Sequence, residues 1–341
     1  KMNVFEGERG CLLDLEEEFL NVISDIPDDG VGFALTGGID SRVTTFAGWY
    51  LRKGKPFTCF CHGVRDAYDV IVAKWIAGKL GVFFYHVPLE VDRDVVERLI
   101  EFTYGEVSLL FSHLLGAYTK ERELFRGVVD GAGGEVLRGF LLWRVRDKGK
   151  ALKGLKEMFT GDSFWRSIGD VQKAKMADEI FMDWMIDRMG AGEDVRDVMD
   201  RLYIELWPVR FASLQAFQSR FLWSYLPFLH FSVLRKGFSL RPCLRERYVF
   251  HFLILRKYPG WRFLPLVYHD IIVPWWANVS PLLTRVFTAV MSNFVERKPF
   301  VGSDYVRDFM KEFPLNVGHE LRSIKCIERL LRYEIMKGGT I

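Results

Sequence analysis

The stretch GFALTGGIDSR, residues 32–42, decides the fold. An apolar run from Val31 to Leu35 stops at Gly37 and Gly38, and a helical pattern of apolar residues begins at Ser41. A short apolar run that ends at glycine is typical of a buried strand, whereas apolar spacing near 3.6 residues is typical of a helix. The stretch therefore predicts a strand, a tight turn and a helix in direct succession.

The same alternation continues to about residue 140. The predicted strands are Val31 to Leu35, Phe57 to Cys61, Val82 to Val87 and Gly127 to Asp130. The predicted helices between them are Ser41 to Lys53, Asp66 to Leu80 and Val91 to Lys120. Strands that alternate with helices predict an α/β fold with a parallel, doubly wound sheet. Later, helices are expected to dominate, among them Val209 to Leu234, Ser280 to Phe294 and Glu320 to Met336.

The spacing of apolar residues along the sequence divides the chain into three predicted parts. Residues 1–24 form a helical lead-in, residues 25–140 the α/β core, and residues 141–341 a large helical elaboration that completes the active-site crevice. In parallel sheets of this kind, ligands bind beyond the carboxyl ends of the strands. Unusual residues fall at three of those ends: Thr36-Gly37-Gly38, His62-Gly63 and Asp130-Gly131. We expect them to converge on one crevice.

Composition indicates an ordinary globular protein. The chain is 49% hydrophobic and 27% charged, and its most apolar stretch, Phe221 to Leu234, is too short to cross a bilayer. The first residues lack the apolar run of a secretory signal, and five cysteines in 341 residues do not form a disulfide framework. We expect a cytoplasmic protein with no membrane contact.

Charge is distributed unevenly along the chain. Residues 1–200 carry 26 Lys and Arg against 34 Asp and Glu, while residues 201–341 carry 21 against 10. The second part should therefore favour an anionic partner, such as nucleotide phosphates or RNA. The chain has only three Gln and five Asn, which is typical of thermophilic proteins.

The turn at residues 36–41 has the features of an anion site. Backbone amides of Gly37 and Gly38 can approach a ligand closely, and the helix start adds its positive dipole end. Thr36 and Ser41 can donate hydroxyl hydrogen bonds, whereas Asp40 would be repelled by phosphate unless a metal ion such as Mg²⁺ lay between them. The alternative is a plain glycine turn in which Asp40 or Ser41 caps the helix.

Two motifs in order carry a resemblance to a known family. The turn resembles the Ser-Gly-Gly-x-Asp-Ser signature of the ATP pyrophosphatase, or PP-loop, superfamily, with Thr36 in place of the first Ser. VVDGAGGEVLRGF, residues 128–140, resembles the Ser-Gly-x-Gly-x-Asp-Glu segment of asparagine synthetases and β-lactam synthetases. The segment between them also resembles the family, and the resemblance covers about residues 12–140.

The resemblance implies an adenine nucleotide α-hydrolase-like fold, the cofactors ATP and Mg²⁺, and an adenylated intermediate. It implies that Asp40 and Glu135 bind the metal and that Asp40, Glu135 and Arg42 are catalytic, Arg42 by holding pyrophosphate. For Arg42 a surface ion pair is the alternative. The implied cofactor-binding residues are Leu35, Thr36, Gly37, Gly38, Ile39, Asp40, Ser41, His62, Gly63, Asp130 and Gly131.

The chain also departs from the family pattern. It has one acidic residue, Glu135, where the family has Asp-Glu, and Trp223, Tyr225 and His230 stand where Glu, Arg and Asp would be. We expect no amino-terminal glutaminase domain, because Cys11 lies inside the chain and too few residues precede the synthetase part. Nitrogen must then come from free ammonia, an amine substrate or a separate ammonia-supplying subunit.

Several further residues have two interpretations. Cys59 and Cys61 share a strand face, either as metal or persulfide ligands or as small buried residues. His62 could border the base or ribose of a nucleotide, or it could be structural. Asp66 could be a ligand or the N-cap of the next helix, and Asp69 could be a ligand or a solvated residue on that helix. Some of the basic residues of the second part should contact phosphate: Arg235, Lys236, Arg241, Arg245, Arg247, Arg256 and Lys257.

The predicted function is a Mg²⁺–ATP-dependent, AMP-forming ligase that adenylates a small-molecule carboxylate and joins it to ammonia or an amine. One alternative is an RNA-modifying, thiolating enzyme with the same chemistry. The other is a nucleotide-binding protein without catalysis. A homo-oligomer is expected in each case.

Overall fold

The structure is a computed structural model. It describes residues 11–65, 67–89, 113–138, 171–187, 200–205, 215–245, 248–268 and 271–274, with a few isolated positions besides. The chain divides into two compact units, the first formed by Lys1–Leu89, Thr119–Phe140 and Phe221–Lys298 and the second by the remaining segments. The three-part division expected from the sequence stays a prediction.

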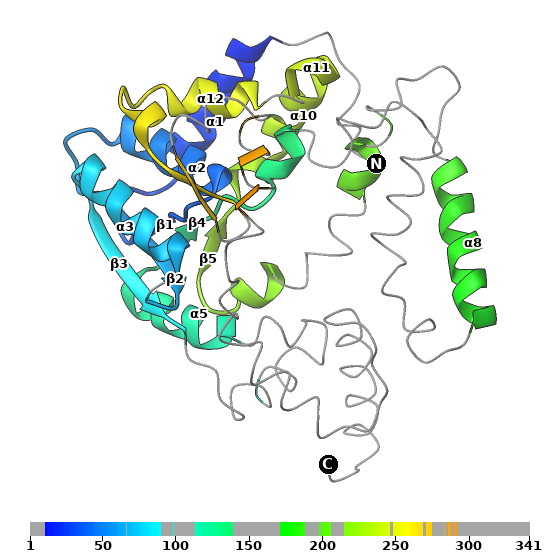
Figure 1. The fold of residues 1–341 in the computed structure, drawn as a ribbon, viewed down its shortest axis with the longest axis horizontal. Helices are drawn as coiled ribbons and strands as arrows, with labels where there is room; N and C mark the ends of the chain where they lie inside the picture. The colour runs from blue at the N-terminus through cyan, green and yellow to red at the C-terminus, as the bar shows by residue number, and fades with distance from the viewer. Residues whose placement is uncertain are drawn as a thin grey trace. The chain divides into compact units, whose positions relative to one another are not determined.

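The first unit is built on a five-stranded parallel sheet (Figure 1). Its strands, in the spatial order β3-β2-β1-β4-β5, are β1 (Val31–Ala34), β2 (Thr58–Gly63), β3 (Phe83–Pro88), β4 (Gly127–Val129) and β5 (Trp223–Tyr225). The predicted α/β class with a parallel sheet is therefore confirmed, and four strands lie within a residue or two of their expected positions.

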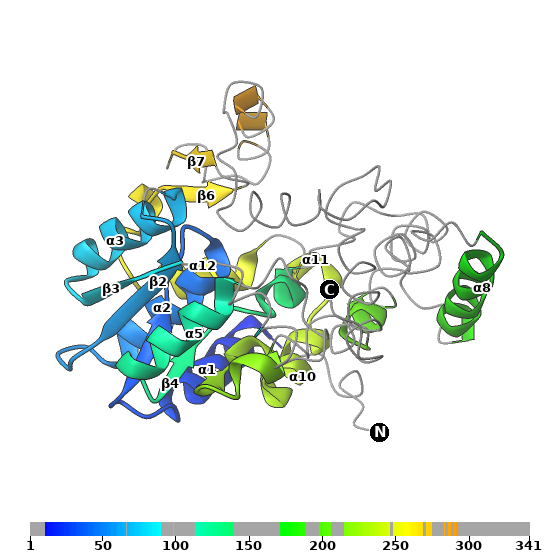
Figure 2. The same cartoon turned by 90° about the horizontal axis from the view of Figure 1, so that it is seen from below.

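Helices lie on both sides of this sheet (Figure 2). They include α1 (Leu12–Ser24), α2 (Ile39–Leu51), α3 (Tyr68–Leu80) and α5 (His113–Leu124). Helix α3 ends where Gly81 adopts φ +69°, the left-handed conformation that glycine tolerates best. The helix expected from Val91 to Lys120 is described only at its end, as α5, and residues 90–112 otherwise lie outside the described residues.

Past β4 the described chain is mostly helical, with two exceptions. Its helical elements are η2 (Gly134–Arg138), α8 (Val171–Asp187), η3 (Pro227–Leu229), α10 (Phe231–Ser239), α11 (Pro242–Arg245), α12 (Val249–Leu255) and η4 (Trp261–Phe263). The exceptions are β5 and an antiparallel hairpin of β6 (Leu266–Tyr268) and β7 (Ile271–Val273).

One predicted helix is wrong. The segment from Val209 to Leu234 was expected to be helical, yet it contains β5 and η3, because the Trp223 amide donates to the Arg126 carbonyl and continues the ladder on β4. The helices expected at Ser280 to Phe294 and Glu320 to Met336 lie almost entirely outside the described residues.

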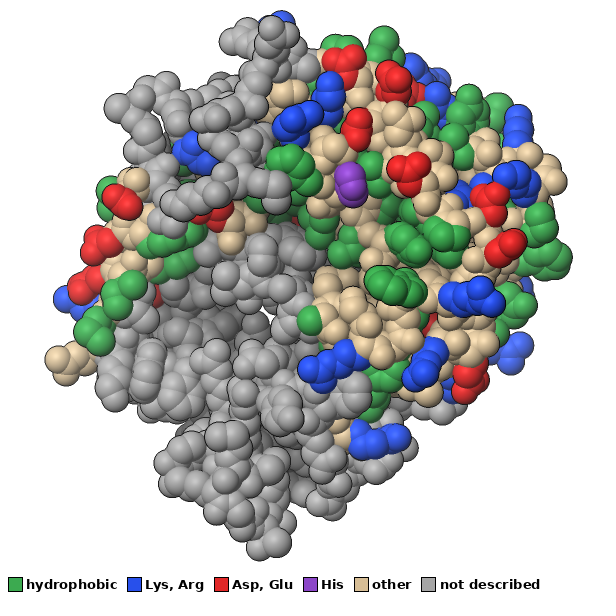
Figure 3. All heavy atoms as spheres, turned by 180° about the vertical axis from the view of Figure 1, so that it is seen from behind, with side chains coloured by type: hydrophobic (Ala, Val, Ile, Leu, Met, Phe, Trp, Pro, Cys, Tyr) green, Lys and Arg blue, Asp and Glu red, His purple; other side chains and the backbone are tan. Residues whose placement is uncertain are grey.

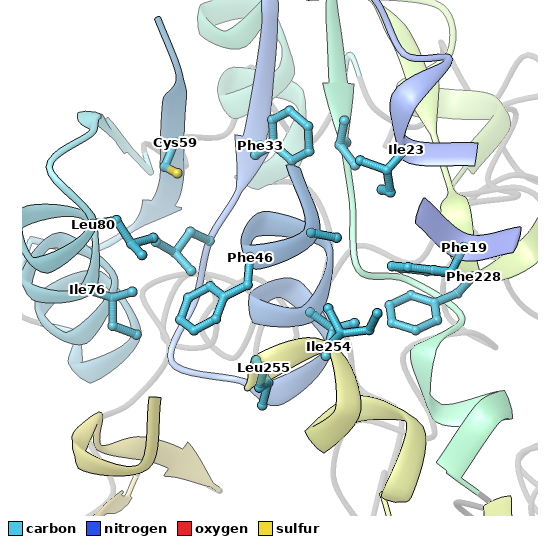
Figure 4. Close-up of a cluster of buried hydrophobic side chains, with 14 of the residues drawn as sticks. Phe19, Ile23, Phe33, Phe46, Cys59, Ile76, Leu80, Phe228, Ile254 and Leu255 are labelled. Atoms are coloured by element: carbon cyan, nitrogen blue, oxygen red, sulfur yellow. The ribbon is translucent and has the colours of Figure 1, made fainter. Parts of the chain in front are cut away.

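Aromatic and aliphatic side chains from both ends of the unit's sequence form one core (Figure 4). Phe19 of α1 packs on Phe228 of η3 with ring centroids 5.0 Å apart, and Phe33 of β1 packs on Phe57 at 4.6 Å. Because β1 is the central strand and is covered by helices, its middle residues Gly32 and Phe33 are buried, as a parallel strand requires.

On the face shown in Figure 3, basic and acidic side chains of the described residues are interspersed with hydrophobic ones. The described residues of this face thus show no large area of one charge sign. Among the helices of the described chain, none combines the length and the hydrophobicity needed to cross a bilayer.

Glycine at position 131 is required by a close approach between backbones. A Cβ atom there would lie 2.5 Å from the Ser41 amide nitrogen and 2.7 Å from the Ser41 Cα atom. Both are backbone atoms of α2, which cannot rotate away as a side chain can. The loop after β4 therefore packs directly on the first turn of α2.

We expect Gly131→Ala to lower the free energy of unfolding by about 1–3 kcal/mol through overpacking. Gly78→Ala is the matched control, since nothing lies within 4 Å of a Cβ built at Gly78 of α3. That substitution should raise stability by up to about 1 kcal/mol, because alanine is the better helix former. Urea denaturation of both variants measures the difference, and equal stabilities would contradict the close packing.

Candidate functional site

Both glycine-rich motifs lie at the switch point of the sheet. Strands β1 and β4 are neighbours; the chain continues from β1 to β2 and β3 on one side and from β4 to β5 on the other. Crevices in open parallel sheets form at this point, beyond the carboxyl ends of the two strands. The structure thus brings together residues 35–41 and 130–135, as the sequence analysis expected.

The turn after β1 is closed by its own side chains. The Thr36 amide donates to Ser41 Oγ at 3.0 Å, and the two hydroxyl oxygens lie 2.9 Å apart. The Gly38 amide donates to Thr36 Oγ1 at 3.0 Å. The two hydroxyl residues of the motif therefore fix the shape of the turn.

Gly37 is anchored to two other segments. Its amide donates to Asp69 Oδ1 of α3 at 2.7 Å, and its carbonyl accepts from the Val267 amide of β6 at 2.8 Å. A Cβ atom at Gly37 would lie 2.2 Å from Val267 Cγ2, so glycine is required. The amides of Gly37 and Gly38 were expected to face a ligand; in the structure both donate within the protein.

The donors that remain belong to the first turn of α2. Gly38 is the N-cap and has no capping side chain, and the amides of Ile39, Asp40 and Ser41 have no acceptor among the described residues. Gly38 is half-buried, with only Thr36 Oγ1 within 4 Å of a Cβ built there. Uncapped amides at the positive end of a helix favour an anion.

Arg42 lies inside the protein. Its Nη2 atom donates to the Gly37 carbonyl at 2.8 Å and also to the Pro265 carbonyl, and the residue is 3% exposed. Burial lowers its pKa to about 9, although the nearby Asp69 carboxylate opposes the shift. The alternative of a surface ion pair therefore does not apply to Arg42. Its hydrogen bonds connect the turn to the segment before β6.

Asp40 is bound by two nitrogen donors. Arg138 Nη2 lies 3.0 Å from Asp40 Oδ2, and His251 Nε2 lies 2.9 Å from Asp40 Oδ1. Burial lowers the pKa of His251, so the neutral ring donates this bond, and the ring stacks on Phe228 at 5.5 Å. One carboxylate thus joins α2 to η2 and α12.

Arg138 is oriented by a second contact. Its Nη1 atom donates to the Tyr248 hydroxyl at 3.0 Å, and its guanidinium lies over the Tyr248 ring. Burial opposes its charge, but Asp40 and Tyr248 outweigh burial and raise the pKa of Arg138. Tyr248 has φ +57°, which is uncommon for a non-glycine residue and places it at the start of α12.

This arrangement does not fit the expected magnesium site. Both carboxylate oxygens of Asp40 accept from nitrogen donors, whereas Mg²⁺ takes oxygen ligands. Among the described residues, no group of three or more His, Cys, Asp and Glu side chains is placed to hold a metal ion. Glu135 lies in the first turn of η2. Metal binding by Asp40 and Glu135 stays a prediction.

A second polar cluster lies at the carboxyl end of β2. His62 Nδ1 is 3.0 Å from Glu121 Oε1 of α5, and the Glu121 side chain is fully buried. Burial would lower the pKa of His62, but the carboxylates of Glu121, Asp130 and Asp69 outweigh it and raise the pKa. Burial raises the pKa of Glu121 and of Asp130.

The other expected binding residues differ in accessibility. Asp130 is half-buried and its Oδ1 accepts from the Ala132 amide at 2.9 Å. Gly63 is buried, and its carbonyl is 2.8 Å from His86 Nε2. Leu35 is 0% exposed and belongs to the core, so its side chain is not available to a ligand.

The burial of the two strand cysteines favours a role in packing over a role as metal or persulfide ligands. Cys59 and Cys61 are 0% and 2% exposed, and burial raises the pKa of both thiols far above the ordinary value. A buried thiol of this kind stays protonated and is a poor nucleophile. Asp66 and Arg247 lie outside the described residues, as does any contact they make.

The remaining basic and aromatic candidates are scattered. Arg245 is 1% exposed, and Lys257 pairs with Glu16 of α1. Trp223 is exposed on β5, and His230 Nδ1 is 2.8 Å from Ser232 Oγ. Phosphate contacts from this part of the chain stay a prediction.

Comparison with known proteins gives little to add. No family model matches the chain, and no curated protein matches it. Solved structures that match include NMN synthetase from Francisella tularensis, with 19% identity over 38% of this chain and 58% of that chain and a TM-score of 0.27. A likeness this weak carries no conclusion about activity.

Sequence reasoning missed the partners of the motif residues. Glu121, His251 and Tyr248 carry no motif, and they meet His62, Asp40 and Arg138 only through the fold. Arg138 lies inside the second motif, so its charge at that position is the one signal that could have been used.

We expect Asp40→Ala to lower the free energy of unfolding by about 2–4 kcal/mol, because Arg138 and His251 would keep buried donors without an acceptor. Glu179→Gln is the control: Glu179 pairs with Lys175 on α8, where both side chains are exposed. It should cost less than about 0.5 kcal/mol. Equilibrium urea denaturation compares the two, and a loss for Asp40→Ala no larger than for the control would contradict the buried network.

The His62 cluster makes stability depend on pH. Because the folded-state pKa of His62 is raised from 6.5, its stabilisation is complete below that value and is lost as pH rises through the folded-state pKa. We expect the free energy of unfolding to fall as pH rises from 6.5 through the folded-state pKa of His62. The fall should be smaller in Glu121→Gln. Urea denaturation at a series of pH values measures the slope, and identical slopes would show that Glu121 does not control His62.

Proposed function

We propose that this protein is an ATP-dependent ligase that activates a substrate carboxylate as an acyl-adenylate, releases pyrophosphate, and forms an amide with ammonia or an amine. One observation carries the proposal. The uncapped first turn of α2 opens at the switch point of the parallel sheet, beside the hydroxyls of Thr36 and Ser41. The resemblance of the two motifs to ATP pyrophosphatases supports the same conclusion.

The α2 end suits the leaving pyrophosphate. Amides of residues 39–41 and the helix dipole are fixed before any ligand binds, because the turn is held by Asp69, Arg42 and Val267. Dipoles that need no reorganisation stabilise charge developing in a transition state. In the proposed first step, a carboxylate oxygen attacks the α-phosphorus and the bond from that phosphorus to the bridging oxygen breaks.

In the proposed second step, nitrogen attacks the acyl carbon and AMP leaves. The chain itself supplies the donors and the charges described above. Of the alternatives, RNA thiolation loses the support of Cys59 and Cys61, because both thiols are buried in the core.

A second candidate function, nucleotide binding without catalysis, is favoured by one observation. Asp40, the residue that the motif assigns to metal binding, is occupied by Arg138 and His251. A protein that keeps this arrangement would bind ATP and release no pyrophosphate. Tight ATP binding without any exchange activity would support this candidate.

Exchange of radioactive pyrophosphate into ATP tests the ligase proposal. The assay is run with carboxylate metabolites and amino acids as acceptors and with tRNA as a separate arm, each with and without Mg²⁺. Exchange that depends on a carboxylate supports the proposal. Exchange with tRNA alone, or none with any acceptor, would overturn it.

We expect Ser41→Ala to slow this exchange by about 10²- to 10³-fold, because Ser41 Oγ holds the turn whose helix end stabilises the developing charge. Ser24→Ala is the control, since Ser24 Oγ donates to the Asn21 carbonyl at the far end of α1. That variant should exchange at the wild-type rate. Full activity in a folded Ser41→Ala protein would place the phosphates elsewhere.

A further inference from the structure

The imidazole of His62 lies beside the turn that the proposed function uses. In the parallel register Ala34 of β1 is level with Phe60 of β2, and the Leu35 amide donates to the Phe60 carbonyl at 2.8 Å. Thr36 and His62 each lie two residues beyond this pair, Thr36 past the end of β1 and His62 within β2. Neighbouring strands are about 4.8 Å apart. His62 thus belongs to the strand that neighbours the one carrying the motif.

Glu121 fixes the direction of this imidazole. Its Oε1 atom is 3.0 Å from His62 Nδ1, while its side chain is 0% exposed and its Oε2 atom is buried without a partner among the described residues. A buried carboxylate at Nδ1 keeps the proton on that nitrogen and leaves the lone pair on Nε2. This is the carboxylate–imidazole arrangement of a general base.

The other ring nitrogen is accessible. The His62 side chain is 35% exposed, and Nε2 has no partner among the described residues and is not one of their buried unpaired atoms. No described residue therefore occupies the lone pair that Glu121 directs outward.

Among the described residues, the charged groups that shift the pKa of this ring are acidic. They come from three elements: Glu121 from α5, Asp130 from the end of β4 and Asp69 from the first turn of α3. A negative potential attracts a cationic molecule and disfavours an anionic nucleophile. An amine, which exists largely as its cation near neutral pH, fits this environment.

We propose that His62, oriented by Glu121, accepts the proton of the amine that attacks the acyl-adenylate, an inference that rests on the ligase function proposed above. An amine that arrives as its cation first gives one proton to solvent, and the neutral amine then forms a C–N bond to the acyl carbon. The bond from that carbon to the phosphate oxygen breaks, and AMP leaves with the electron pair. The proton of the nitrogen passes to His62 Nε2 and then to solvent.

The two half-reactions separate this role from the ligase function itself. Pyrophosphate exchange needs no base for the amine, whereas amide formation does. We expect His62→Gln to slow amide formation with ammonium or hydroxylamine about 10²- to 10⁴-fold more than it slows exchange with the carboxylate that the screen identifies. His86→Gln is the control: His86 pairs with the Gly63 carbonyl on the neighbouring strand, and its loss should leave both rates unchanged.

Glu121→Gln tests the positioning role. The carboxylate raises the pKa of His62, so the acidic limb of the pH profile for amide formation should move to lower pH when the charge is removed. NMR titration of the His62 ring should show the same displacement without any substrate. A role in packing alone would alter the rate and leave the pH profile in place.

The outcomes are distinct. If the wild-type protein exchanges no pyrophosphate with any carboxylate, the ligase function fails and this inference fails with it. If exchange occurs and His62→Gln forms amide at the wild-type rate, only the role of His62 is overturned. An unchanged His62 titration in Glu121→Gln would likewise refute the pairing that the role requires.

Discussion

The hydrogen bonds of Gly37 fix the turn on which the whole site depends. Its amide reaches Asp69 on α3 and its carbonyl reaches Val267 on β6, so one residue joins the central strand to two segments distant in the sequence. Arg42 adds a third tie from inside α2. Because the turn cannot move independently of these segments, the first turn of α2 points its free amides in one direction. The glycine is needed for this packing, since Val267 leaves no room for a side chain.

The two glycines of the turn therefore have different tasks. Gly37 is buried and held by α3 and β6, whereas Gly38 is half-buried, donates its amide to Thr36 Oγ1 and begins α2 as its N-cap. The glycines of the second motif are also structural: a Cβ atom at Gly134 would lie 2.6 Å from the Asp40 side chain, and one at Gly131 would meet the backbone of Ser41. Much of what a sequence motif preserves here is the close packing of two loops, and the ligand donors are the amides that this packing leaves free.

The sequence predicted the part of the fold in which local pattern and tertiary structure agree. Strands β1 to β4 are marked by short β-branched and aromatic runs, and three of these runs end at glycine or a polar residue. Strand β5 and the β6–β7 hairpin were missed, because their three-residue strands lie in segments whose apolar spacing is also compatible with a helix. Their structure is decided by pairing partners: β4 for β5, and the turn at Gly37 for β6.

The same limit applies to the site, where residue types were predicted and charge pairs were not. Asp40 was expected to need a cation, and the fold supplies the guanidinium of Arg138 together with a buried histidine. The carboxylates of Glu121, Asp130 and Asp69 surround His62 instead, one strand away. Under the proposed reaction these two environments answer opposite needs: a departing phosphate requires donors, and an attacking amine requires a proton acceptor.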